Sequence, residues 1–151
     1  MEPVAKPSTS PIDLSTTSGV ERAVFSRECE VKMEYGLHAR PSVMLIKLSK
    51  HFVSVHDGAS VEFKVGDYCV NPAQGFLAML SLVAGTGSVI VASVRGLEPE
   101  RAREFLDAVQ SLVGHPCPEE AIYASDATQQ LSLAPAVVEA LRRSISDDRR
   151  L

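Results

Sequence analysis

The sequence predicts an α+β fold, a two-layer sandwich in which a four-stranded, mainly antiparallel sheet carries three helices on one face. Segments of period-two alternation are interleaved with segments of helical periodicity, in the order strand, helix, strand, strand, helix, strand, helix. The two middle strands flank a Gly-Asp pair, which is typical of a hairpin turn and makes the sheet antiparallel or mixed. Amphipathic helices bury their apolar stripes by packing together on one face of such a sheet.

The first strand and the first helix are predicted on either side of Gly36. Apolar and charged residues alternate in FSRECEVKM, residues 25–33, as in a half-buried strand. Its inward-facing residues would be Cys29, Val31 and Met33. Apolar residues then recur with helical spacing from Pro41, and because proline is tolerated in a first turn, a helix is predicted from about residue 40 to 51. Its polar side would consist of Ser42, Lys47, Ser49 and Lys50.

A hairpin and a short apolar helix are predicted in the middle of the chain. SVEFKV, residues 60–65, alternates again, and YCV, residues 68–70, would be the returning strand. Asn71 can cap the helix that follows, with Pro72 in its first turn, and Gly85 would end it.

One more strand and one more helix complete the predicted domain. SVIVASVR, residues 88–95, is a nearly continuous β-rich run and is expected to be a central strand, and a strongly amphipathic helix follows it as far as Val113. The domain would therefore span residues 26–113. Residues 1–25 are rich in Pro, Ser and Thr and are expected to be a flexible tail. Residues 114–151 would be a linker and a C-terminal extension in which one short helix can form.

Composition and charge limit the classes of function. Hydrophobic residues make up 45% of the chain and charged residues 23%, as in soluble globular proteins. The net charge of −4 and the absence of a basic stripe argue against nucleic-acid binding. No apolar run is long enough to cross a membrane, and the N-terminus lacks the pattern of a secretory signal, so we expect a cytoplasmic protein. Three cysteines without a CxxC pair are expected to be buried free thiols: Cys29, Cys69 and Cys117.

His38 is the candidate for chemistry, because it stands just before the predicted helix. Backbone N–H groups at a helix start lack intrahelical partners and, with the helix dipole, attract anions. Arg40 adds a guanidinium fork that matches phosphate oxygens, and neutral imidazole is a good nucleophile. Together these features suit reversible phosphorylation, although on spacing alone such a histidine is more often an ordinary solvated residue.

Other roles for His38 find less support in the sequence. No Cys or carboxylate lies at ligand spacing from it, and Arg40 would repel a cation. A Ser–His triad lacks its nucleophile-elbow pattern. We therefore expect neither a metal nor a cofactor.

The string GLHARP, residues 36–41, resembles the active-site signature of the HPr family, the histidine-containing phosphocarriers of the bacterial phosphoenolpyruvate:sugar phosphotransferase system. The resemblance covers about residues 26–113 and implies the HPr-like open-faced sandwich. It also implies that His38 accepts a phosphoryl group on Nδ1 from enzyme I and passes it to enzyme IIA proteins, with Arg40 beside the phosphoryl oxygens. The phosphate-binding residues would be Ala39, Arg40 and Pro41.

The resemblance further implies a surface for partner docking. Lys47 and Lys50 fall where the family carries basic residues on the first helix, and Phe76 and Leu77 fall on the apolar patch of the second. Each pair also fits an ordinary role, as solvated lysines and as core residues.

Two departures from the family pattern affect regulation and transfer. Many relatives carry a regulatory serine, the target of HPr kinase, at the start of the second helix, but here Gln74 takes that position and Ser81 lies inside the helix. Control by HPr kinase is therefore in doubt. Tyr35 stands near the histidine where small polar residues are common in the family.

The sequence thus leads to a monomeric phosphocarrier that takes part in sugar transport and is not itself an enzyme. The alternative is a regulatory HPr-like paralogue, in a nitrogen-type or incomplete phosphotransferase system, that signals through its phosphorylation state. A scaffold that has lost transfer is a third interpretation, and it would require Tyr35 or a tail to block the site.

Overall fold

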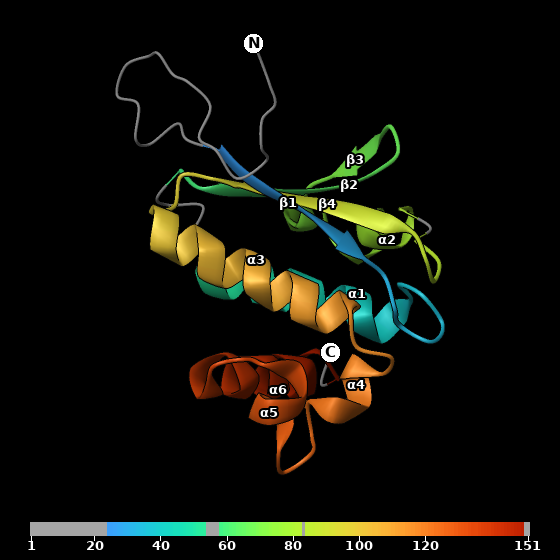
Figure 1. Cartoon of the computed structure of the whole chain (residues 1–151), viewed down its shortest axis with the longest axis vertical. Coiled ribbons are helices and arrows are strands. Elements are labelled where there is room, and N and C mark those ends of the chain that lie inside the picture. The colour runs from blue at the N-terminus through green and yellow to red at the C-terminus, as the bar shows by residue number, and fades with distance from the viewer. Residues whose placement is uncertain (1–23, 54–57, 83, 150–151) are drawn as a thin grey trace.

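One antiparallel sheet of four strands, in the order β1-β4-β2-β3, forms the upper layer of the computed structural model (Figure 1). The structure describes residues 24–53, 58–82 and 84–149, so most of the predicted N-terminal tail lies outside the described residues. Strand β4 is central and pairs antiparallel with both β1 and β2, as predicted. The strands are β1 (Val24–Glu30), β2 (Ser60–Val65), β3 (Tyr68–Val70) and β4 (Val89–Arg95).

Three helices cover one face of this sheet, which confirms the predicted α+β sandwich (Figure 1). They are α1 (Ala39–Phe52), α2 (Phe76–Leu80) and α3 (Pro99–Val113). Strands β2 and β4 alternate as the sequence predicted, since their inward side chains are buried and the intervening ones are more exposed. The buried inward residues of the sheet include Cys29, Val61, Phe63, Ile90, Ala92 and Val94. Val31 and Met33 are also buried, although β1 ends at Glu30.

The second helical segment is broken, whereas the sequence predicted one continuous helix. A 3₁₀ turn, η3 (Pro72–Gln74), precedes α2, and Gly75 between them has φ +108° and ψ −178°, outside the helical region. Asn71 caps η3 as expected: its side chain accepts a hydrogen bond from Ala73 N at 2.8 Å, and Asn71 N donates to Gln74 Oε1 at 2.7 Å. Gln74 therefore closes a capping box, and Gly75 is the residue directly before α2.

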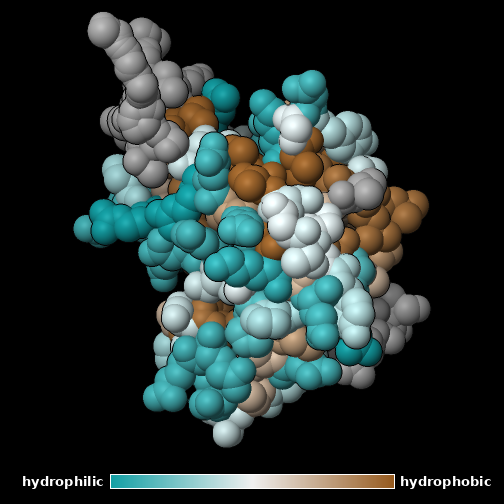
Figure 2. Space-filling model, turned by 45° about the vertical axis from the view of Figure 1, so that its right-hand side comes forward, coloured by the Kyte–Doolittle hydropathy of each residue, from teal (hydrophilic) through white to brown (hydrophobic). Residues whose placement is uncertain are grey.

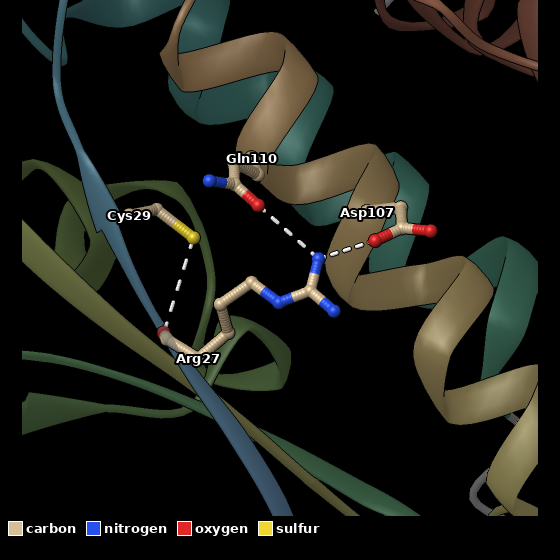
Figure 3. Close-up of polar contacts among 4 residues, drawn as sticks. All are labelled: Arg27, Cys29, Asp107 and Gln110. Atoms are coloured by element: carbon tan, nitrogen blue, oxygen red, sulfur yellow. Dashed lines mark hydrogen bonds and ion pairs between the residues drawn. The ribbon is translucent and has the colours of Figure 1, made fainter. Parts of the chain in front are cut away.

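A polar contact joins β1 to α3 on the outside of the sandwich. The Arg27 guanidinium reaches from β1 to Asp107, with which it forms an ion pair, and donates to Gln110 Oε1 at 3.2 Å (Figure 3). Burial raises the pKa of the neighbouring Cys29 thiol to about 11. Not all cysteines are buried, however, because Cys69 is exposed and Cys117 is half-buried; all three are free thiols.

The C-terminal extension folds into a third layer, where the sequence left room for only one short helix. Helices α4 (Pro118–Ala121), α5 (Ala127–Leu131) and α6 (Pro135–Arg149) lie on the far side of α1 and α3 from the sheet (Figure 1). Their buried residues join the same core as the sandwich: Ile122, Ala127, Leu131, Leu133, Val137, Val138 and Leu141. Arg142 fixes the layer internally by donating to Ile122 O at 2.6 Å and to Ala124 O at 2.9 Å. None of the described helices has the length and apolar character needed to span a membrane.

Helix α1 is consequently buried on two sides: α6 packs against it, and the sheet lies on its other side, where both contribute to one core (Figure 1). The sequence assigned Ser42 and Ser49 to a polar side, but the structure buries both. Ser49 satisfies its hydroxyl by donating to Leu45 O at 2.8 Å, one turn earlier in the helix. The apolar stripe alone could not reveal the second contact, because it comes from a segment about 90 residues further along the chain.

Candidate functional site

The site begins with a tight loop in which Gly36 has φ +73°. A Cβ at this position would lie 2.7 Å from the carbonyl oxygen of Ala84, so only glycine fits. Two hydrogen bonds fix the loop: Gly36 N donates to Met33 O at 3.0 Å, and Leu37 N donates to Ala84 O at 2.7 Å. The turn that the sequence predicted at Gly36 therefore fixes the position of His38, two residues further along the chain.

His38 is the N-cap residue of α1, with an extended backbone conformation. Its carbonyl oxygen accepts the hydrogen bond from Ser42 N at 3.0 Å, while its imidazole makes no capping hydrogen bond and remains about one-third exposed. Pro41 has no N–H, so the first turn offers the N–H groups of Ala39 and Arg40 without an intrahelical acceptor. Two of the three residues predicted to bind phosphate, Ala39 and Arg40, therefore carry free backbone donors at the helix start beside the imidazole.

Arg40 lies in the first turn of α1, and its side chain is exposed. It forms no ion pair with any residue in the described part of the chain. A guanidinium in this state is available to an anion, because no carboxylate of the described residues forms an ion pair with it.

Two side chains from different segments flank the imidazole of His38. The Tyr35 ring contacts it edge-on, with 6.3 Å between ring centroids and 75° between the ring planes, and Tyr35 itself is 76% exposed. The carboxylate of Glu119, on α4 of the C-terminal extension, lies 3.5 Å from His38 Nε2. Nδ1 is the nitrogen that Glu119 does not contact.

Glu119 was not predicted from the sequence, which placed it in a linker. Its position depends on the path of the chain after α3, and its distance from His38 in the sequence does not indicate a contact between them. The only local signal is Pro118, which with the two acidic residues behind it is typical of a helix start.

The predicted docking residues lie on α1 and on α2, which pack against each other. Lys50 is exposed, whereas Lys47 is half-buried and has a polar partner. Phe76 is 37% exposed and Leu77 is 77% exposed, so both reach the surface instead of the core. Figure 2 shows that apolar surface gathers on the upper part of the molecule, over the sheet and its helices, while the part formed by α4 to α6 is mainly hydrophilic.

The start of the second helix carries no hydroxyl group. Gly75, not Gln74, directly precedes α2, and neither residue can be phosphorylated on a side-chain oxygen. Ser81 follows the helix, is exposed, and donates to Ala78 O at 2.5 Å. Among the described residues no group of three or more His, Cys, Asp or Glu side chains is arranged to hold a metal ion.

Comparison with known proteins places this geometry in a family. The family model described as PTS HPr component phosphorylation site matches residues 25–114. The chain belongs to the HPr family. The phosphocarrier protein HPr from Bacillus anthracis strain Ames is 26% identical, with a TM-score of 0.50, over 60% of this chain and 98% of that one.

A second solved HPr, from Thermoanaerobacter tengcongensis, is 24% identical with a TM-score of 0.48, over 60% of this chain and 96% of that one. The comparison with curated proteins gave no match. Since the HPr family model ends at residue 114, helices α4, α5 and α6 lie beyond it.

Proposed function

We propose that this HPr-family protein is a cytoplasmic phosphocarrier that accepts a phosphoryl group on His38 from phospho-enzyme I and passes it to enzyme IIA proteins. The observation that carries the proposal is the position of His38, whose imidazole is about one-third exposed at the N-cap of α1, beside two backbone donors and the exposed Arg40. The family match supports the same role, because it is the phosphorylation-site model that covers residues 25–114.

The chemistry requires a nucleophilic nitrogen and donors for the charge of the phosphoryl group. The lone pair of Nδ1 attacks phosphorus, and the bond to the donor breaks with its electron pair leaving on the donor. The N–H groups of Ala39 and Arg40 and the Arg40 guanidinium bind the phosphoryl oxygens, on which negative charge is concentrated. The helix dipole adds only about 0.3–1 kcal/mol, so Arg40 is expected to carry the larger share of the binding.

Partner docking is proposed on the surface formed by Tyr35, Phe76 and Leu77. Phe76 and Leu77 are neighbours in α2 and both are exposed, as is Tyr35 beside His38; exposed apolar surface of this kind is typical of protein interaction sites. Lys50 adds a positive charge on α1, and a partner with an acidic rim would complement it. The protein would act as a monomer in each encounter.

The phosphocarrier role is tested by incubating the full chain with enzyme I and labelled phosphoenolpyruvate. We expect an acid-labile label on the wild type and on the control His51→Ala, whose histidine lies at the other end of α1, and no label on His38→Ala. Arg40→Ala is expected to slow labelling while the circular dichroism spectrum is unchanged. Label on His38→Ala would refute the site, and no label on the wild type would refute the function.

The regulatory paralogue is the second candidate, and the C-terminal extension favours it. Packing of α6 on α1 covers part of that helix, and Lys47 is half-buried. A protein of this kind would take the phosphoryl group from enzyme I and would bind another protein in one phosphorylation state only. Transfer of the label from the phosphorylated chain to an enzyme IIA protein distinguishes the two, since only the carrier passes it on.

A further inference from the structure

The C-terminal extension places one carboxylate directly against the proposed phosphorylation site. Glu119 Oε2 lies 3.5 Å from His38 Nε2, and the Glu119 side chain is only 13% exposed. A carboxylate is rarely sheltered to this degree without a partner. In the described part of the chain its ion-pair partner is His38.

The approach of Glu119 to His38 is built into the backbone. Lys32 N donates to Val113 O at 2.7 Å, and Glu34 N donates to Pro116 O at 2.7 Å, so the chain leaving α3 is tied to the segment that leads to His38. Pro118, which opens α4, is buried. Glu119 is thus held by two hydrogen bonds and a packed proline, and not by a free tail.

Helices α5 and α6 hold α4 from the other side. Arg142 of α6 donates to Ile122 O at 2.6 Å and to Ala124 O at 2.9 Å, directly after α4. Ile122 and Leu141 are fully buried. The whole extension therefore supports the position of one side chain beside the imidazole.

We propose that Glu119 is a positioning residue for His38, which keeps the imidazole proton on Nε2 and leaves the lone pair of Nδ1 free to take the phosphoryl group. The effect of Glu119 on phosphoryl transfer rests on the proposed function, whereas its contact with His38 does not. At 3.5 Å the contact is an ion-pair distance, so the carboxylate acts chiefly through its charge. A negative charge beside Nε2 favours the tautomer with its proton there, because the alternative proton position on Nδ1 is further away.

The same contact serves both directions of transfer. When Nδ1 attacks, the Nδ1–P bond forms, the donor keeps the electron pair of the bond that breaks, and Glu119 faces the positive charge that develops on the ring. When the phosphoryl group leaves, the pair of the Nδ1–P bond stays on Nδ1, and the imidazole is neutral with its proton still on Nε2. No proton has to enter or leave the ring in either step.

The test is the tautomer of His38, read from the ¹⁵N shifts and two-bond couplings of the imidazole in the full-length labelled protein, at a pH where the ring is neutral. We expect the wild type and Glu120→Gln, which alters the exposed neighbour on α4, to show the proton on Nε2. Glu119→Gln removes the charge with little change in shape. It should lower the ratio of the two tautomers about three- to tenfold, because moving the partial positive charge of one N–H group from Nε2 to Nδ1 changes the Coulomb energy by only a fraction of the value for two unit charges.

A second readout separates this proposal from the proposed function. Phosphorylation by enzyme I should be slower in Glu119→Gln than in the wild type and unchanged in Glu120→Gln, because loss of the charge both lowers the population of the nucleophilic tautomer and removes the stabilisation of the positive ring. A wild-type proton on Nδ1, or the same tautomer ratio in both variants, overturns the role of Glu119 whether or not the protein is phosphorylated. Absence of phosphorylation with the expected tautomer shift would instead overturn the phosphocarrier function alone.

Discussion

Gly36 holds the loop that carries His38, and its replacement by alanine is expected to destabilise the fold more than any ordinary glycine substitution. Its φ of +73° lies in the left-handed region, where a residue with a Cβ is strained by about 1–2 kcal/mol. The new Cβ would also lie 2.7 Å from Ala84 O and 2.9 Å from Gly85 Cα, both backbone atoms that cannot rotate away. Forcing such a contact costs about 1–3 kcal/mol more.

Gly66, in the hairpin turn between β2 and β3, is a matched control for this clash. Its φ is +59°, and a Cβ there would meet nothing within 4 Å. Gly66→Ala should therefore show the left-handed strain alone, and the unfolded-state gain from alanine, about 0.4–1 kcal/mol, is common to both variants. The difference between the two free energies of unfolding isolates the contact with Ala84, and we expect about 1–3 kcal/mol.

Urea unfolding followed by circular dichroism measures both values. For a chain of this size the difference also corresponds to a melting temperature lower by about 2–4 °C per kcal/mol. Equal loss of stability in Gly36→Ala and Gly66→Ala would show that the loop yields to the new Cβ. Gly36 would then not be the residue that fixes the position of His38.

Two further predictions concern the extension and the thiols. Leu141→Ala removes a fully buried side chain from α6 and should lower the free energy of unfolding of the whole chain by about 2–5 kcal/mol, whereas Glu139→Ala, at an exposed position of the same helix, should change it little. If the free energy of unfolding of Leu141→Ala equals that of the wild type, the extension is not part of the cooperative core. The exposed Cys69 should react with a thiol reagent in the native protein at pH 8.5, and the buried Cys29 only after unfolding. Burial raises the Cys29 pKa to about 11, so its reactive thiolate stays scarce until the pH approaches that value; labelling of Cys29 in the native protein, read by mass spectrometry, would contradict this.

Most of the sandwich could be predicted from the sequence because its signals are local. Alternation located the strands, proline and asparagine marked helix starts, and the Gly-Asp pair marked the hairpin. The break at Gly75 was missed because glycine is tolerated in an apolar helical pattern, and only the backbone angle of φ +108° reveals it. The prediction that Ser42 and Ser49 lie on a polar, solvent-facing side was wrong, because the sequence pattern shows that they are polar but not which helix packs against them.

The sequence by itself determined the candidate nucleophile. An anion-binding helix start needs only local features, and residues 36–41 supply them with a glycine, a histidine, an arginine and a proline. These residues lie together in any fold that forms this turn and this helix.

Only the tertiary structure decided what faces the other nitrogen of that histidine. Glu119 stands 81 positions from His38 in the chain, and the contact exists because the extension folds back over α1. Periodicity and capping signals act over one or two turns, so they carry no information about a pairing of this length. Burial of a shared core brings the two side chains together, and that core is a property of the whole chain.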